Sequence, residues 1–125
     1  CGWFDTVLVG QSIAINGITD VVLTKLDVLD ELEEIQVCVG YETKHKKYNY
    51  LPFDENIQNI LMPIYETIPG WQESTFGLTS WDDLPKKAQN YISFLESKIE
   101  KNISIISTGP DRAHTIDRNN LLGNN

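Results

Sequence analysis

The stretch that decides the fold is residues 83–110, DLPKKAQNYISFLESKIEKNISIISTGP. Pro85 stands where its missing N–H costs nothing, in the first turn of a helix, so we expect a helix from there to about Lys101. The apolar side chains that recur at helical spacing and form one face are Ala88, Tyr91, Ile92, Leu95 and Ile99. The apolar run at residues 103–106 then predicts a buried strand that ends in the small-residue loop 107–110. Helix, buried strand and small-residue loop in succession are typical of a nucleotide-binding α/β sheet.

A second strand and loop of this kind are predicted near the start of the chain. Residues 21–23 (VVL) are short, branched and continuously apolar, as expected of a strand buried on both faces in a parallel sheet. The polar loop 24–27 (TKLD) follows this strand, and a helix over residues 5–15, capped by Asp5 and stopped by Asn16-Gly17, precedes it. The expected fold class is therefore α/β: a mostly parallel buried sheet with flanking helices and with nucleotide-binding loops at the carboxyl ends of its strands.

The middle of the chain is predicted to decorate this core. Residues 35–41 and 47–51 predict two strands around a polar turn, so a β-hairpin completes the expected fold. The turn carries the basic run 44–47 (KHKK), which we interpret as solvated because so short a run usually keeps an exposed loop soluble. Residues 62–71 mix aromatic residues with prolines and a glycine, which favours an extended, irregular stretch.

The composition indicates one globular domain. With 125 residues, 41% of them hydrophobic and 22% charged, the chain has room for one core, and it contains no apolar stretch long enough to cross a bilayer. The formal net charge of −8 argues against a nucleic-acid partner, because phosphate contacts need clustered Lys and Arg. The two cysteines make neither a disulfide framework nor a zinc site, and Cys38 is expected to be a small buried hydrophobe. With no hydrophobic leader and no lipidation signal, we expect a soluble, cytoplasmic protein without a membrane partner.

The two strand-end loops suggest a site for a guanine base. If the two strands are neighbours, the loops meet at one edge of the sheet, where open α/β sheets bind ligands. An Asp27 carboxylate could accept two hydrogen bonds side by side, and guanine alone among the common bases offers an adjacent N1–H and N2–H₂. Lys25 would lay its methylene stem on one face of the base and Pro110 would cover the other. The backbone N–H groups of Thr108 and Gly109 would donate to the guanine O6, with Ser107 shaping the loop.

Short motifs of this kind also have a plainer explanation. Asp27 could cap the turn at residues 28–30, Lys25 could be a surface charge, and residues 107–109 could form an ordinary loop. Spacing alone leaves the two interpretations at about even odds.

Four blocks, in this order, resemble the adenylosuccinate synthetase family: CGWFD at residues 1–5, LTKLDVLD at 23–30, PIYETIPGW at 63–71 and ISTGPDR at 106–112. The resemblance extends to about Arg118. It implies a homodimeric, Mg²⁺-requiring ligase that uses GTP to join IMP and L-aspartate in the step of purine synthesis that leads toward AMP. The family's guanine contacts fall on the positions of Lys25, Leu26, Asp27, Ser107, Thr108 and Gly109.

Other parts of the family pattern have no counterpart in this chain. These are the Gly-rich phosphate loop, the catalytic Asp and His, the IMP-binding segments and the Arg-rich aspartate-binding loop. We therefore expect residues 1–118 to be a C-terminal guanine-binding segment without a catalytic residue or metal ligand of its own, silent when alone, with the Mg²⁺ ligands in the missing N-terminal part. Residues 119–125 are expected to be a disordered tail. His45 and His114 match no catalytic position of the family and are interpreted as surface histidines.

Two other functions remain open from the sequence. The chain could fold alone and bind guanine nucleotides weakly, without chemistry. It could instead be a structural or interface module in which Trp3, Trp71 and Trp81 pack against the missing half.

Overall fold

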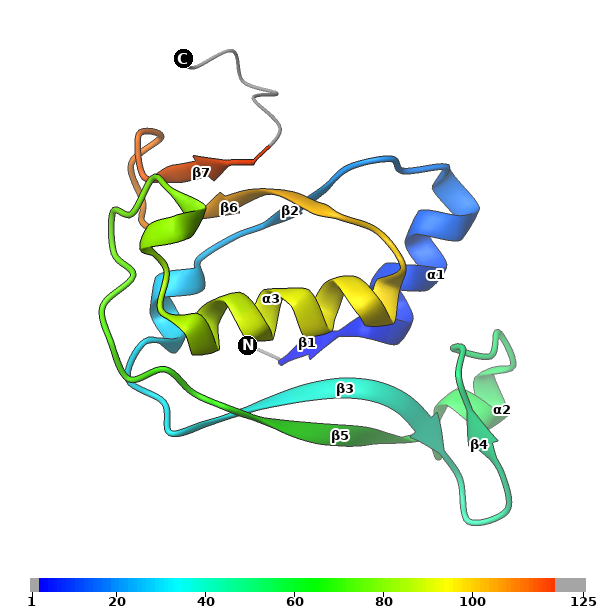
Figure 1. Cartoon of the computed structure of the whole chain (residues 1–125). Coiled ribbons are helices and arrows are strands. Elements are labelled where there is room, and N and C mark those ends of the chain that lie inside the picture. Colours follow the sequence, from blue (N-terminus) through cyan, green and yellow to red (C-terminus); the bar gives the residue numbers. More distant parts are fainter. Residues whose placement is uncertain (1–2, 119–125) are drawn as a thin grey trace.

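The helix expected after Pro85 is the centre of the fold. A computed structural model describes residues 3–118, and in it helix α3 (Lys86–Ile99) begins directly after Pro85 and ends at Glu100. The apolar face predicted for this helix is confirmed, because all of its members are buried: Ala88, Tyr91, Ile92, Leu95 and Ile99. Burial also raises the pKa of the Tyr91 hydroxyl to about 12. Figure 1 shows α3 lying between two sheets, which it separates.

One of these sheets carries both of the strands predicted to be buried. Strand β6 (Ile103–Ser107) lies in the middle, parallel to β2 (Val21–Leu23) on one side and antiparallel to β7 (Thr115–Asp117) on the other. The prediction that β2 is buried on both faces is wrong, since Val22 is 54% exposed. Strand β2 is also the edge strand of this sheet among the described strands, and an apolar run alone does not reveal whether both faces of a strand are covered.

The other sheet is built on β3 (Glu34–Glu42). It pairs in parallel with β1 (Phe4–Asp5) and antiparallel with β4 (Lys47–Tyr48) and β5 (Met62–Pro69). The predicted hairpin is confirmed, although β4 has only two residues. The irregular stretch expected at residues 62–71 is wrong, because β5 pairs along the whole of β3. Strand β5 has β3 as its only partner among the described strands, and prolines are tolerated in such edge strands.

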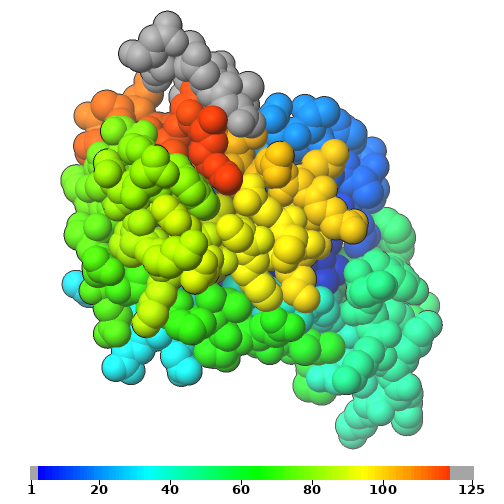
Figure 2. Space-filling view, viewed as in Figure 1, coloured from blue at the N-terminus to red at the C-terminus, as the bar shows by residue number. Residues whose placement is uncertain are grey.

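The α/β fold class is confirmed, with a change in how the strands are arranged. The strands form two mixed sheets with one parallel pair each, in place of one mostly parallel sheet. A single cluster of buried side chains joins the sheets through α3, which agrees with the expectation of one core. Figure 2 shows β4 and the short helix α2 (Glu55–Gln58) projecting from the body of the molecule.

The first helix follows its predicted boundaries closely. Helix α1 (Thr6–Asn16) is capped by the Asp5 carboxylate, which accepts hydrogen bonds from the backbone N–H groups of Val7 and Leu8 at 3.0 Å. Gly17 ends the helix with a φ of 64°, the left-handed conformation that glycine adopts without steric cost.

Cys38 and the tryptophans show where the core lies. Cys38 is buried, as predicted, and burial followed by the charge of Asp5 raises the pKa of its thiol. Trp71 is buried against Tyr91, and Trp81 stacks beneath the Arg118 guanidinium at 4.0 Å. Trp71 and Trp81 therefore pack within this chain. No helix among residues 3–118 is both long and apolar enough to cross a membrane.

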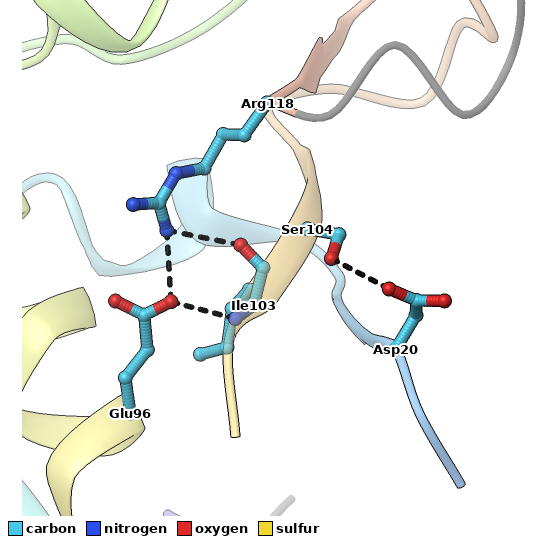
Figure 3. A network of polar contacts seen from close by, with 5 residues as sticks. All are labelled: Asp20, Glu96, Ile103, Ser104 and Arg118. Atoms are coloured by element: carbon cyan, nitrogen blue, oxygen red, sulfur yellow. Dashed lines mark hydrogen bonds and ion pairs between the residues drawn. The ribbon is translucent and has the colours of Figure 1, made fainter. Parts of the chain in front are cut away.

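A polar network fixes the end of α3 to the start of β6 (Figure 3). One Glu96 carboxylate oxygen accepts hydrogen bonds from the Ile103 backbone N–H at 2.7 Å and from the Arg118 guanidinium at 2.9 Å. The same guanidinium nitrogen donates to the Ile103 carbonyl at 3.0 Å. Nearby, the Ser104 hydroxyl donates to Asp20 at 3.0 Å, which ties β6 to the residue before β2. The network thus joins α3, β6, β7 and the entry to β2.

Replacing Glu96 is expected to weaken this junction. In Glu96→Gln the side chain keeps its volume but loses the ion pair with Arg118, so we expect the free energy of unfolding to fall by about 1–3 kcal/mol in urea titrations followed by circular dichroism. The control is Lys98→Gln, because the Lys98–Glu66 ion pair is long, at 3.9 Å, and exposed. That change should cost less than about 0.5 kcal/mol. Equal stability of the two variants would contradict the structural role of Glu96.

Candidate functional site

The two loops predicted to form a site leave the same edge of one sheet. In the parallel pair of β2 and β6, Val22 is opposite Ile105 and Leu23 is opposite Ile106. The chain therefore enters residues 24–27 and residues 107–110 from adjacent strand ends that point the same way. The adjacency on which the predicted site depends is confirmed.

After β2 the chain forms a short 3₁₀ helix, η1 (Leu26–Leu29). Lys25 precedes it with a φ of 58°. This left-handed backbone conformation is rare for residues other than glycine, and it turns the chain sharply. Leu26 is buried in the core cluster, so its side chain anchors the turn and is not available to a ligand. Lys25 is exposed, and Asp27 is half-buried on the next turn.

Two carboxylates of this segment have opposite surroundings. Asp30 accepts hydrogen bonds from the Trp71 indole N–H at 2.8 Å, from the Thr75 backbone N–H at 2.8 Å and from the Thr75 hydroxyl at 2.6 Å. The Asp27 carboxylate, in contrast, makes no hydrogen bond or ion pair within residues 3–118. The alternative in which Asp27 caps the turn is therefore not what the structure shows. Asp30 holds the turn in place and leaves Asp27 open.

Sequence reasoning missed Asp30 as the residue that fixes this loop. Its partners lie 41 and 45 residues further along the chain, and only Trp71 belongs to the stretch that was expected to be irregular. The only available signal was its place in the block at residues 23–30, which does not reveal a partner.

The second loop differs from its prediction at Thr108. Thr108 is fully buried, its N–H donates to the His114 carbonyl at 2.8 Å, and its hydroxyl donates to the Leu78 carbonyl at 2.8 Å. The expectation that its N–H donates to a guanine O6 is thus not met in this conformation. The Gly109 N–H has no partner within residues 3–118 and remains a free donor. Ser107 shapes the loop as expected, since its hydroxyl donates to the Gly109 carbonyl at 3.1 Å, and Pro110 is exposed.

The two histidines differ in their exposure to solvent. His45 lies exposed on the turn before β4, as predicted. His114 is only partly exposed, and its Nδ1 is buried, so the interpretation of this residue as a surface histidine is wrong. Its ring packs against Gly109 and Phe76.

Two depressions lie on either side of η1. Asp27 lines one of about 660 Å³, and Lys25 lines another of about 460 Å³, with Val28 at the border of both. Residues 107–110 line neither depression. The structure therefore brings both loops to one edge of the sheet, while these two depressions are lined by the first loop and not by the second.

The depression beside Asp27 is acidic. Its other lining residues include Asp30, Glu31 and Glu73, and none is Lys or Arg. Such a surface accepts hydrogen bonds and repels phosphate groups. Within residues 3–118 no cluster of His, Cys, Asp or Glu is suited to hold a metal ion.

Two single variants test the different roles of Asp27 and Asp30. Asp30→Ala leaves the Thr75 N–H and the Trp71 indole without their acceptor, so we expect the free energy of unfolding to fall by about 2–4 kcal/mol. Asp27→Ala should change it by less than about 0.5 kcal/mol, because the carboxylate has no partner to lose. Urea titration followed by tryptophan fluorescence measures both. If the Asp27 variant lost as much stability as the Asp30 variant, Asp27 would be a structural residue.

Comparison with known proteins identifies the family of this chain. A model of the adenylosuccinate synthetase family matches residues 1–116. The adenylosuccinate synthetase of Coxiella burnetii is 51% identical over 118 residues, which are 94% of this chain and 27% of that protein. The one from Ehrlichia canis is 50% identical over 120 residues, 96% of this chain and 28% of its own. The structure of a fully ligated adenylosuccinate synthetase from Plasmodium falciparum superimposes with a TM-score of 0.85 at 36% identity, covering 94% of this chain and 28% of that one. This chain, which spans little more than a quarter of the length of these relatives, belongs to the adenylosuccinate synthetase family.

Proposed function

We propose that this chain is the segment of an adenylosuccinate synthetase that binds the guanine base of GTP. The observation that carries the proposal is the Asp27 carboxylate, which has no partner within residues 3–118 although it lies at a strand-end edge and lines a depression of about 660 Å³. The neighbouring Asp30, which caps the same 3₁₀ turn, is held by Trp71 and Thr75, so the fold alone explains its presence. The Asp27 carboxylate has no such partner within residues 3–118, so we propose that it binds a ligand that donates hydrogen bonds.

Guanine fits this arrangement better than adenine does. Its N1–H and N2–H₂ donate side by side, as a carboxylate requires, and its O6 accepts from a backbone N–H such as that of Gly109. Adenine presents an acceptor at N1 and an amine at C6, so it would leave Asp27 unpaired and place a donor against a donor. Leaving a desolvated carboxylate unpaired is costly, and such sites can reject an analogue that lacks the partner by on the order of 10⁴-fold.

The charge around the site indicates that only the base end of the nucleotide binds to this segment. The acidic lining beside Asp27 would repel a triphosphate, whereas guanine is neutral and carries the donors that carboxylates favour. We therefore propose that the phosphates, the Mg²⁺ ion, IMP and L-aspartate bind to parts of the family's enzyme outside this chain. The whole protein would then be a cytoplasmic, homodimeric, GTP-dependent ligase that forms adenylosuccinate, and residues 1–118 would be inactive by themselves.

The proposal predicts a change of base preference. In the complete enzyme that carries this segment, Asp27→Asn replaces one acceptor oxygen by a donor, so KM for GTP should rise by about tenfold or more. Use of XTP should improve relative to GTP, because xanthine has an oxygen at C2 that accepts from the new amide. The matched control is Glu31→Gln, which removes the same charge from the same depression and should leave the GTP-to-XTP ratio as it is.

A scaffold role is the second candidate, and one observation favours it. Large apolar side chains are exposed on the β2 side of the molecule, among them Val22, Val28 and Trp3. Trp71 and Trp81, which the sequence suggested for such a surface, are already packed within this chain.

Titration of the 125-residue chain with GTP, followed by ¹H–¹⁵N NMR with ATP as control, separates the candidates. Base recognition by the isolated chain predicts shifts at Lys25, Asp27 and Gly109 with GTP only. Shifts that are equal with ATP would count against base recognition. A folded chain that gives no shifts, together with an Asp27→Asn enzyme of unchanged base preference, would favour the scaffold.

A further inference from the structure

The imidazole of His114 lies between the loop at residues 107–110 and the segment at residues 75–78. A methyl group at Gly109 would lie 2.3 Å from His114 Nδ1 and 2.9 Å from its Cγ, so the ring occupies the space that a side chain at position 109 would need. On its other side the ring packs on Phe76, with 4.9 Å between ring centroids and a tilt of 59°. The His114 ring thus acts as a wedge between Gly109 and Phe76.

Backbone hydrogen bonds converge on the same place. The His114 carbonyl accepts from the Thr108 N–H at 2.8 Å, and the His114 N–H donates to the Asp111 carbonyl at 2.9 Å. The Thr108 carbonyl in turn accepts from the Gly77 N–H at 3.1 Å. Residues 107–110 are thus attached to the turn 111–114 on one side and to the segment 75–78 on the other. Both the main chain and the side chain of His114 take part in these contacts.

The His114 ring is held in place by packing against Gly109 and Phe76, without a hydrogen bond at its Nδ1 within residues 3–118. His114 Nδ1 is buried and has no hydrogen-bond partner within residues 3–118. An unsatisfied buried nitrogen is destabilising, and an apolar ring at this position would avoid that cost. Phe76, which the wedge supports, is 55% exposed and lines the same depression as Asp27. The ring therefore connects the Gly109 N–H, a free donor, to the wall of the depression that holds the free carboxylate.

We propose that His114 is a positioning residue for base recognition: by filling the space beside Gly109 it fixes the direction of the Gly109 N–H toward O6 of the purine. The inference rests on the proposed function and adds a separate step to it. Asp27 recognises the N1 and N2 edge, whereas His114 acts only through the O6 contact. Variants of the two residues should therefore change KM for GTP and KM for other purine nucleotides in different proportions.

The prediction uses ITP, which has the O6 and N1–H of guanine but no amino group at C2. In the complete enzyme, His114→Ala removes the wedge, so KM for GTP and KM for ITP should both rise by about tenfold, in equal proportion, while kcat changes less than twofold. Asp27→Ala should instead raise KM for GTP more than KM for ITP, because only GTP donates from N2. The control is His45→Ala on the exposed turn, which should leave all of these values unchanged.

A double variant tests the geometry directly. Gly109→Ala places a methyl group against the His114 ring and should displace the loop, which also raises KM for GTP. Adding His114→Ala frees that space, so the double variant should use GTP better than Gly109→Ala alone. A His114→Phe variant, which keeps a ring and removes the unpartnered nitrogen, should stay within about threefold of the parent KM and melt no lower.

Three outcomes decide the matter. An unchanged KM for GTP in folded His114→Ala overturns the positioning role and leaves the proposed function standing. Additive effects in the double variant overturn it as well, because they would show that the ring and the Gly109 backbone are not coupled. A parent enzyme that does not distinguish GTP from ATP refutes the proposed function and this inference together.

Discussion

Parallel pairing of β2 with β6 is the constraint on which the candidate site depends. These strands are separated by about two-thirds of the chain, and nothing local brings residues 24–27 near residues 107–110. The pairing is stable because α3 packs its apolar face against both sheets and returns the chain to the start of β6. Glu96 and Arg118 then secure the beginning of β6, at the opposite end of the strand from the site. The strand is thus fixed at one end by charge and hydrogen bonds, and its other end leads into the candidate site.

Within each loop, buried and open residues have different functions. Leu26 and Thr108 lie in the middle of the two motifs and are buried, so they set the course of the backbone. Asp27, Lys25, Gly109 and Pro110 retain groups that the protein does not use. The residues of such a motif are contiguous in sequence, but adjacent positions face opposite ways. Buried positions stabilise the loop, and open positions remain accessible to a ligand. This division explains why the side chain of Leu26 and the N–H of Thr108 are poor candidates for ligand contact although they stand inside the motifs.

The sequence was sufficient where the deciding interactions are local. The face of α3, the Asp5 cap and the Gly17 stop follow from spacing and from hydrogen bonds within a few residues. The meeting of the two loops followed from the sequence only if their strands were neighbours, and the pairing of β2 with β6 supplies that condition. Strand β5 was missed because its pairing with β3 is entirely long-range and its prolines resemble breaks. Asp30 and His114 were missed for the same reason, since their partners are distant in sequence and no spacing rule connects them.

The acidity of the chain is consistent with a role limited to a neutral base. A carboxylate costs free energy when it loses water, and it regains that energy from well-placed hydrogen-bond donors such as the N1–H and N2–H₂ of guanine. Neighbouring carboxylates such as Glu31 and Glu73 do not repel a neutral base, but they repel any phosphate group that approaches the same surface. The nucleotide would therefore bind in one orientation, with its base toward Asp27 and its phosphates directed away from the acidic wall. We propose that the negative charge of this wall is what orients the nucleotide.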